Sequence, residues 1–432
     1  MVRVNEDVLR PLVEYDAPAR FDWHVEQITN TAGCRLTGGS GASCWGYNQS
    51  NLVRFEQDLY ALSWRDDLTL AIFRRLDSGK WEMGPVLPPV PQNGNLLVDS
   101  TGRLHVIGGD RASWHVLFDE PGRIDCFELR RRVLADSRFG ASIDDQDRIF
   151  VGGGLEQLGW YILDGAKDFQ VVASGQLTHD QARGYSFLMF HNGAVHTFCS
   201  DDYFLPGDHF PNQQVKYKDA QTGEPIVIET EHGIYPVLRA YYYYNRDVMA
   251  MPDAWDMTVM SDVSDTFAEP PAGDGSRGTT DQQDLFLDGD GQLHFVYYEN
   301  RQPSREVWAG TGQDAANSRL YHAVGPPGGP FQTWCLGNFN SGRLYQTPDG
   351  RLHYFLTFGR RGAAQSLWYA VSETGRWDRM SEPMKLDTGG GFWHFFTNIK
   401  RTGGTCVDWV DGYWTGPSGG NSNEVFYGRL KP

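Results

Sequence analysis

The sequence predicts an all-β fold, a single β-propeller of four-stranded blades. Short apolar runs separated by turn residues recur along the chain, and no long stretch has helical periodicity. A turn followed by Leu or Val, His and an apolar run also repeats: "DSTGRLHVIGG" from Asp99, "FHNGAVHTF" from Phe190, "DGDGQLHFVYY" from Asp288 and "TPDGRLHYFLT" from Thr347. Repeats with a period of this order are typical of propellers and solenoids.

The slot of the repeated histidine predicts the number of blades. It is occupied in turn by Tyr60, His105, Phe150, His196, Met249, His294, His353 and Val407, so successive units lie 45 to 59 residues apart. That period is about the length of one four-stranded propeller blade. We therefore expect eight blades in residues 51–432, or seven if the weak unit around Met249 is not a complete blade.

Each unit contains the strands of a blade in order. An apolar strand such as "NLLVDS" or "DLFLDG" precedes the slot strand, and a third strand such as "SLWYAVS" follows it. A fourth strand is often opened by an aromatic residue, but the last unit stops after its third, "EVFYGRL". We expect "ARFDWHVEQI" to supply the missing strand, because an unpaired sheet edge is a liability. Residues 1–432 then form one domain, with the closing strand and a glycine-rich loop in 1–50.

The repeated histidines are predicted to be structural. Tyr, Phe, Met and Val occupy the same slot in other units, and a metal-binding or catalytic role would not tolerate them. We expect His105, His196, His294 and His353 to be buried, packed between blades and satisfied by hydrogen bonds. No metal-binding motif is present: the acidic stretch at Asp288 has Leu293 where a calcium loop needs glycine, so it is interpreted as a hairpin turn. The sequence leaves the cofactor unknown.

Charge and hydropathy limit the partners. The 432 residues include 55 acidic and 38 basic side chains, giving a net charge of −17. This balance argues against binding to nucleic acid or to anionic membranes. No apolar run is long enough to span a membrane, and "MVRVNEDVLRPLVEYD" lacks the apolar segment of a signal peptide. We expect a cytoplasmic protein, or a secreted one whose signal peptide has been removed; the oligomeric state stays open.

A ring of small or polar residues is expected at the mouth of the channel. Ten residues before each slot lie Ser50, Asn95, Gly140, Ser186, Arg239, Asp284, Arg343 and Thr397. Nearby loops add Arg183, Arg301, Arg305 and Arg360. Because guanidinium groups bind carboxylates in a bidentate manner, we expect an anion pocket here. The alternative is a structural ion-pair network that ties the blades together.

The strand pairs of the form D-G-x-L-H and the turns of the form x-G-x-W resemble the BNR-like, sialidase-like propellers of carbohydrate-active enzymes. "SETGRW" from Ser372 approaches the Asp-box S-x-D-x-G-x-x-W, although no complete box occurs. Propeller polysaccharide lyases that act on uronate glycans are similar in their loose repeats. The resemblance implies a histidine or tyrosine as base and acid, with arginine on the uronate carboxylate.

The sequence thus predicts a carbohydrate-active enzyme for an anionic saccharide, with a polysaccharide or oligosaccharide lyase as the first interpretation. In β-elimination, Arg239 and Arg343 would neutralise the uronate carboxylate, while Tyr185, Tyr241 or His179 would transfer the protons.

Two alternatives remain open. A glycoside hydrolase would use paired carboxylates, either Asp284 with Glu299 or Asp201 with Asp202. A non-catalytic propeller would bind a glycan or a protein on the same face.

Overall fold

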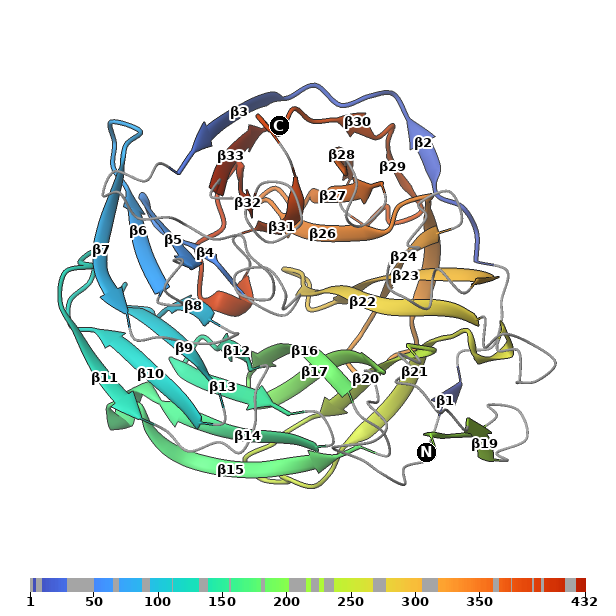
Figure 1. The fold of residues 1–432 in the computed structure, drawn as a ribbon, viewed down its shortest axis with the longest axis horizontal. Helices are drawn as coiled ribbons and strands as arrows, with labels where there is room; N and C mark the ends of the chain where they lie inside the picture. The colour runs from blue at the N-terminus through green and yellow to red at the C-terminus, as the bar shows by residue number, and fades with distance from the viewer. Residues whose placement is uncertain are drawn as a thin grey trace.

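Seven sheets, each built on four antiparallel strands, stand around one axis in the computed structural model (Figure 1). The structure describes residues 3–4, 10–28, 50–64, 70–87, 94–110, 112–131, 139–154, 157–179, 183–201, 215–218, 225–228, 237–266, 277–304, 318–359, 365–373, 375–390, 392–397, 400–415 and 425–432. The first strand of each blade contacts the first strand of the next, and the seventh contacts the first. The described strands therefore form a closed ring.

The first four blades run from the axis outwards in chain order. Blade 1 holds β4 (Leu52–Phe55), β5 (Asp58–Trp64), β6 (Leu70–Arg75) and β7 (Trp81–Leu87). Blade 2 holds β8 (Gly94–Val98), β9 (Leu104–Asp110), β10 (Ala112–Phe118) and β11 (Phe127–Arg131). Blade 3 holds β12 (Gly140–Ile143), β13 (Arg148–Gly153), β14 (Gln157–Asp164) and β15 (Gln170–Thr178). Blade 4 holds β16 (Arg183–His191), β17 (Ala194–Asp201), β20 (Arg239–Asn245) and β21 (Asp256–Asp262).

The remaining blades follow the same order. Blade 5 holds β22 (Arg277–Leu287), β23 (Leu293–Ser304), β24 (Ser318–Gly325) and β25 (Gln332–Gly337). Blade 6 holds β26 (Ser341–Gln346), β27 (Leu352–Phe358), β28 (Ser366–Ser372) and β30 (Met384–Lys385). Blade 7 holds β31 (Trp393–Thr397), β32 (Val410–Thr415), β33 (Val425–Lys431) and β3 (Asp22–Gln27). A separate hairpin pairs β18 (Val215–Lys218) with β19 (Pro225–Ile228).

The expectation of eight blades is wrong, and the stated alternative of seven is confirmed. Met249 lies in the turn between β20 and β21, so the weak unit is the outer half of blade 4. β20 pairs with β17 from Ala240 to Asn245, which makes "YYYYN" the third strand of that blade. The repeat period was stretched there because the segment between β17 and β20 is long and carries the separate β18–β19 hairpin.

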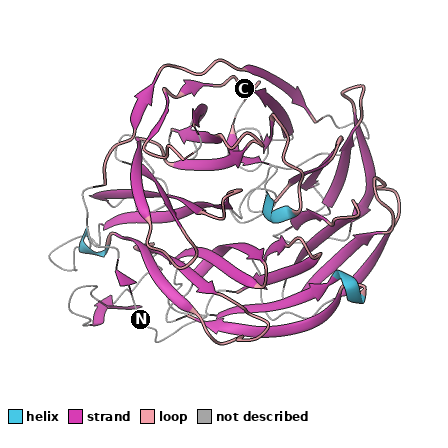
Figure 2. Ribbon diagram, turned by 180° about the vertical axis from the view of Figure 1, so that it is seen from behind, coloured by secondary structure: helices cyan, strands magenta, loops and turns pink. Residues whose placement is uncertain are grey.

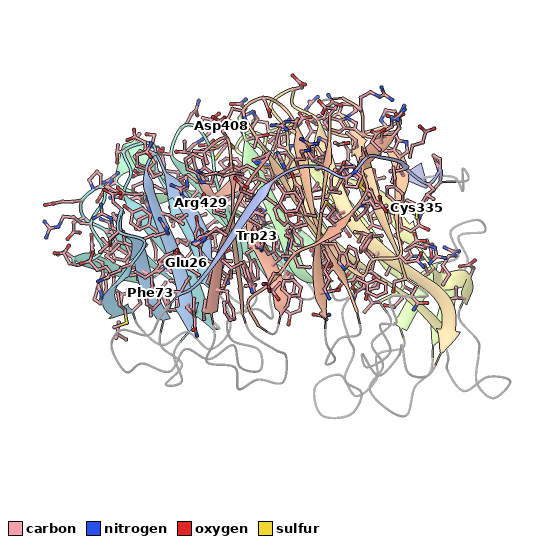
Figure 3. All side chains as sticks on the ribbon, turned by 90° about the horizontal axis from the view of Figure 1, so that it is seen from above. Trp23, Glu26, Phe73, Cys335, Asp408 and Arg429 are labelled. Carbon is pink, nitrogen blue, oxygen red and sulfur yellow. The ribbon has the colours of Figure 1, made fainter. Side chains whose placement is uncertain are left out.

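The N-terminal segment closes the ring, as expected. β3 pairs with β33 as the outermost strand of blade 7. Before that, the chain adds parallel contacts to three further blades: β1 (Arg3–Val4) to β21, Leu12 to Cys335, and β2 (Glu14–Asp16) to β29 (Arg379–Ser381). Figure 3 shows the segment crossing the outside of the ring, with Trp23 and Glu26 on β3. We call residues 3–4 and 10–27, the described parts of this segment, the belt.

The repeated histidines are buried, and each links its blade internally. In blade 5, His294 Nε2 lies 3.0 Å from Asp288 Oδ2 and His294 Nδ1 lies 2.9 Å from His322 Nε2. Asp288 Oδ1 also accepts the backbone N–H groups of Asp290 and Gln292, which makes the stretch a hairpin turn. Equivalent contacts join His105 to His115, His196 to Tyr242, and His353 to Thr347 and Tyr369.

Helix is confined to three 3-10 turns among the described residues (Figure 2): η1 (Gly165–Lys167), η2 (Ser264–Thr266) and η3 (Lys400–Thr402). No helix in this part of the chain is long and apolar enough to cross a membrane. η3 lies at the centre of the ring, against β8, β12, β16 and β22 (red in Figure 1). A Cβ on Gly403 would stand 1.9 Å from Val98 O, so only glycine allows this approach to β8.

Seven of the eight residues predicted to form a ring do lie at the inner strands. They are buried, however, and do not line an open mouth. Ser50, Asn95, Gly140, Ser186, Asp284, Arg343 and Thr397 lie on or beside inner strands, and all are buried. Arg239 is the exception, because it begins β20, the third strand of blade 4. Of the predicted pair Arg239 and Arg343, only Arg343 therefore lies on an innermost strand.

Candidate functional site

The ends of the second strands of the blades and the starts of their first and third strands lie on one face of the ring, which we call the link face. Figure 3 shows Asp408, from the segment between β31 and β32, on the opposite face. Four of the predicted site residues lie at the link-face ends of their elements: His179 follows β15, Tyr185 lies near the start of β16, and Arg239 and Tyr241 open β20. Long connections on a rigid scaffold are where function concentrates.

A histidine and two tyrosines pack together where blades 3 and 4 meet. The rings of His179 and Tyr243 have centroids 5.4 Å apart, and those of Tyr243 and Tyr241 are 6.2 Å apart. Both tyrosines belong to the apolar cluster shared with Phe150 and Trp160 of blade 3. The alternation of β20 directs these two side chains to blade 3, whereas Tyr242 and its even-numbered neighbours face blade 5.

Arg239 lies beside this aromatic group. Its Nε donates to Asp262 Oδ2 at 2.8 Å and its Nη2 donates to Ser264 Oγ at 3.3 Å, while its backbone N–H donates to Asp201 Oδ2 at 3.0 Å. Burial lowers the pKa of Arg239, but Asp262, Tyr241 and Asp201 outweigh it and raise the pKa above the usual value. The side chain is therefore a fixed cation next to Tyr241.

Tyr185 has a strained backbone near the start of β16, the innermost strand of blade 4. Its φ of 52° lies in the left-handed region, which is uncommon for a residue other than glycine. The β16–β17 register shifts between Gly184 and Phe187, so Tyr185 lies in a bulge. Its carbonyl accepts a hydrogen bond from Gln282 Nε2 of blade 5 at 3.3 Å. Such bulges re-aim side chains and are frequent next to active sites.

The two carboxylates expected as a hydrolase pair face different neighbours. Asp284 faces blade 6, where its Oδ2 accepts the backbone N–H of Leu344 and its Oδ1 lies 3.7 Å from Arg343 Nη1. Glu299 faces blade 4 and accepts hydrogen bonds from Ser261 and Arg10. Both are buried and already paired, and they do not form a shared site.

Arg343 lies in the interior of the ring. Its Nε donates to Phe395 O at 3.1 Å, and its guanidinium stacks over Phe187 at 5.2 Å. Arg401 of η3 stacks over the same ring at 5.0 Å. Burial raises the pKa of Asp284 despite both arginines, and it lowers the pKa of Arg401 to about 10. Asp284 and Arg343 thus match part of the ion-pair network that the sequence offered as the alternative to an anion pocket, whereas Arg239 pairs with Asp262.

The outer arginines are described only in part. Arg301 is exposed and its Nη2 donates to both oxygens of Asp265 at 2.8 Å. The backbone of Arg183 pairs with Asp201, but its side chain lies outside the described residues. Arg305, Arg360 and Asp202 also lie outside the described residues. The described residues hold no group of three His, Cys, Asp or Glu side chains that could bind a metal.

Sequence reasoning missed two participants. Asp262, which holds Arg239, ends β21 and carried no local signal. Arg10 reaches Glu299 from 289 residues away in the chain, a contact that no pattern in the sequence predicts.

Solved structures with this fold include polysaccharide lyases. An ulvan lyase of polysaccharide lyase family PL25 has a TM-score of 0.58 at 11% identity, with 93% of this chain and 95% of that chain covered. The same kind of lyase bound to -[GlcA(1-4)Rha3S]- gives 0.58 at 12% identity over the same shares. Polysaccharide lyase Uly1 gives 0.56 at 9% identity, covering 96% and 100%.

At these identities the likeness shows the fold. No protein-family model and no curated protein sequence matches the chain. The similarity to BNR and sialidase propellers therefore stays at the level of the repeat pattern.

Proposed function

We propose that the protein is a lyase that cleaves a uronate-containing saccharide by β-elimination at the link face between blades 3 and 4. One observation carries the proposal: the ring contact between His179 and Tyr243, 5.4 Å between centroids, continues through Tyr241 to the buried cation Arg239. A base, an acid and a carboxylate-binding cation are the groups that this reaction requires.

In the proposed reaction, Arg239 binds the uronate carboxylate and stabilises the negative charge that develops on it. His179 removes the proton from the carbon next to the carboxylate, since a neutral imidazole is a base near pH 7. The electrons of that C–H bond form the new carbon–carbon double bond as the bond to the leaving oxygen breaks. Tyr241 gives its proton to the leaving oxygen, and Tyr243 orients the imidazole by ring contact.

Two further points support a lyase over the alternatives. The solved structures reported above that share the fold across nearly the whole chain are polysaccharide lyases, one of them bound to -[GlcA(1-4)Rha3S]-. A hydrolase using Asp284 and Glu299 has no such support, because these carboxylates face different blades. We therefore place the saccharide over His179 and Arg239 rather than over the channel.

A panel of uronate glycans tests the proposal. Ultraviolet absorbance from unsaturated uronate products is expected for at least one glycan. New reducing ends without that absorbance would indicate a hydrolase instead. Binding without either signal would indicate a non-catalytic propeller.

Variants then assign the groups. His179→Ala and Tyr241→Phe are expected to lower kcat about 100-fold or more, the usual contribution of a general acid or base. Tyr244→Phe is the matched control, because it removes a hydroxyl from the same strand on the face towards blade 5. An equal loss in Tyr244→Phe would contradict the assignment. If Tyr185→Phe alone abolished turnover, the acid would be Tyr185 on β16.

A further inference from the structure

Arg10 of the belt reaches between blades 4 and 5. Arg10 stacks over the ring of Tyr321 at 4.7 Å and over that of Tyr297 at 5.7 Å, both in blade 5. Its guanidinium donates to Glu299 Oε1. The other described belt contacts to blades 4, 5 and 6 include backbone pairings, exposed ion pairs, a hydrogen bond from Tyr15 Oη to Leu336 O, and the packing of Val13 in an apolar cluster of blades 5 and 6. Among the described belt residues, Arg10 is thus the one whose side chain bonds at the interface of blades 4 and 5.

The two carboxylate oxygens of Glu299 have different arginine partners, one in the belt and one in blade 5. Its carboxylate is 2% exposed and accepts Ser261 Oγ of blade 4 at 2.7 Å on the same oxygen that binds Arg10. The other oxygen, Oε2, lies 3.6 Å from Arg301 Nη1. A buried carboxylate of this kind needs its cations, because an uncompensated buried charge is costly.

Arg301 also forms hydrogen bonds to the turn that follows β21. Its Nη1 donates to the backbone carbonyl of Asp262 at 3.1 Å, and its Nη2 donates to the carboxylate of Asp265. The carboxylate of Asp262 accepts Arg239 Nε at 2.8 Å, and Ser264 of the same turn accepts Arg239 Nη2. The turn therefore holds Arg239 on one side and Arg301 on the other.

We propose that Arg10 is a positioning residue for Arg239, acting through the contact chain Glu299, Arg301 and Asp262. Arg301 lies between two anions, Glu299 and the carboxylate of Asp265. When Arg10 is present, it satisfies Glu299 and leaves Arg301 to hold the turn. Without Arg10, the buried Glu299 draws Arg301 towards itself, and the turn that orients Arg239 loosens. The belt would then do more than close the ring, because it would also set the carboxylate-binding group of the site.

Hydrogen exchange tests the contact chain without any substrate. Arg10→Ala is expected to speed amide exchange in peptides covering 237–245 and 261–266. The matched control is Arg379→Ala, which removes the ion pairs that Glu14 and Asp16 of the belt make with Arg379 of blade 6, away from this chain. Unchanged exchange in 261–266, or equal changes in both variants, would overturn the inference. If Arg10→Ala fails to fold, Asp265→Asn cuts the same chain at an exposed residue and should give the same local increase.

Kinetics test the consequence for the site, and this part rests on the proposed function. Arg10→Ala is expected to lower kcat/KM roughly 3- to 30-fold, the usual range for coupling through a contact network. In an Arg239→Lys background its effect should shrink to less than about two-fold, because both changes act on one group. Full additivity would overturn the positioning role.

The two proposals fail separately. A wild-type protein without lyase activity on any uronate glycan would overturn the proposed function, while the exchange measurement would still decide the contact chain. Changed exchange with unchanged kcat/KM would overturn the positioning role and leave the lyase assignment standing.

Discussion

Glu26 of the closing strand accepts two hydrogen bonds from Arg75 of blade 1, at 2.8 Å from Nε and 3.1 Å from Nη2. Trp81 Nε1 of the same blade adds a third at 2.8 Å. Both charged side chains are mostly buried, and the guanidinium of Arg75 stacks over Tyr427 at 5.4 Å. The seam between the last blade and the first is therefore joined by polar bonds from an N-terminal strand.

Glu26→Gln is expected to lower the free energy of unfolding by about 1–3 kcal/mol, because charge-assisted hydrogen bonds are lost in a part-buried site. Chemical denaturation near pH 7 measures it. Glu120→Gln is the control, since its ion pair with Arg123 is exposed and should contribute little. Equal stability of Glu26→Gln and the wild type would mean that the seam is held by the β3–β33 ladder and apolar packing alone.

His353→Ala is expected to cost about 1–3 kcal/mol of stability, because it removes buried hydrogen bonds to Thr347 and Tyr369. Lyase turnover per folded molecule should be unchanged well below the melting temperature. Thermal melts and kinetics on the same preparation check both statements. A variant with an unaltered melting temperature and no turnover would show that the histidine slot is functional after all.

The buried histidines predict a loss of stability on acidification. Burial lowers the pKa of His196 and of His353 to about 3, from 6.5, and it also lowers the pKa of His105, His294 and His322. Between the ordinary pKa of 6.5 and the lowered pKa, a histidine binds a proton in the unfolded chain but stays neutral in the folded chain. Stability is therefore complete above about pH 6.5 and falls as the pH drops towards 3, with His196 and His353 each contributing about 1.4 kcal/mol per pH unit in that window.

Urea unfolding from pH 8 to pH 4 measures this dependence. His353→Gln keeps a donor and an acceptor but cannot titrate, so its stability should fall less steeply than that of the wild type. A wild-type stability that stays level from pH 7 to pH 5 would contradict the prediction.

Arg343→Ala is expected to destabilise the fold by about 3 kcal/mol or more, because it removes a buried partner of Asp284. Arg351→Ala is the control on the same blade, since its ion pair with Asp349 is partly exposed. Melting temperature and turnover are measured on both. Unchanged melting with a specific loss of saccharide turnover would return Arg343 to the carboxylate-binding role that the sequence suggested.

Much of the fold could be predicted because its determinants are local. Strand alternation, tight turns and the histidine slot repeat along the chain, and each depends on residues a few positions apart, as Asp288 and His294 illustrate. The need to close an open edge also predicted the role of β3. The lyase interpretation came from the resemblance to propeller polysaccharide lyases, and His179, Tyr241 and Arg239 were separate candidates named from their expected places near the mouth.

What only the tertiary structure decided rests on contacts between distant segments. The pairing of β20 with β17 reduces eight units to seven and moves Arg239 to a third strand. η3 brings Arg401 to the Phe187 ring that Arg343 also covers, and the belt carries Arg10 to Glu299. The energy of such contacts depends on burial and on charges supplied by other blades. A local sequence pattern therefore does not predict these contacts. Only the closed ring shows which charged side chains lie in the interior and which lie at the candidate site.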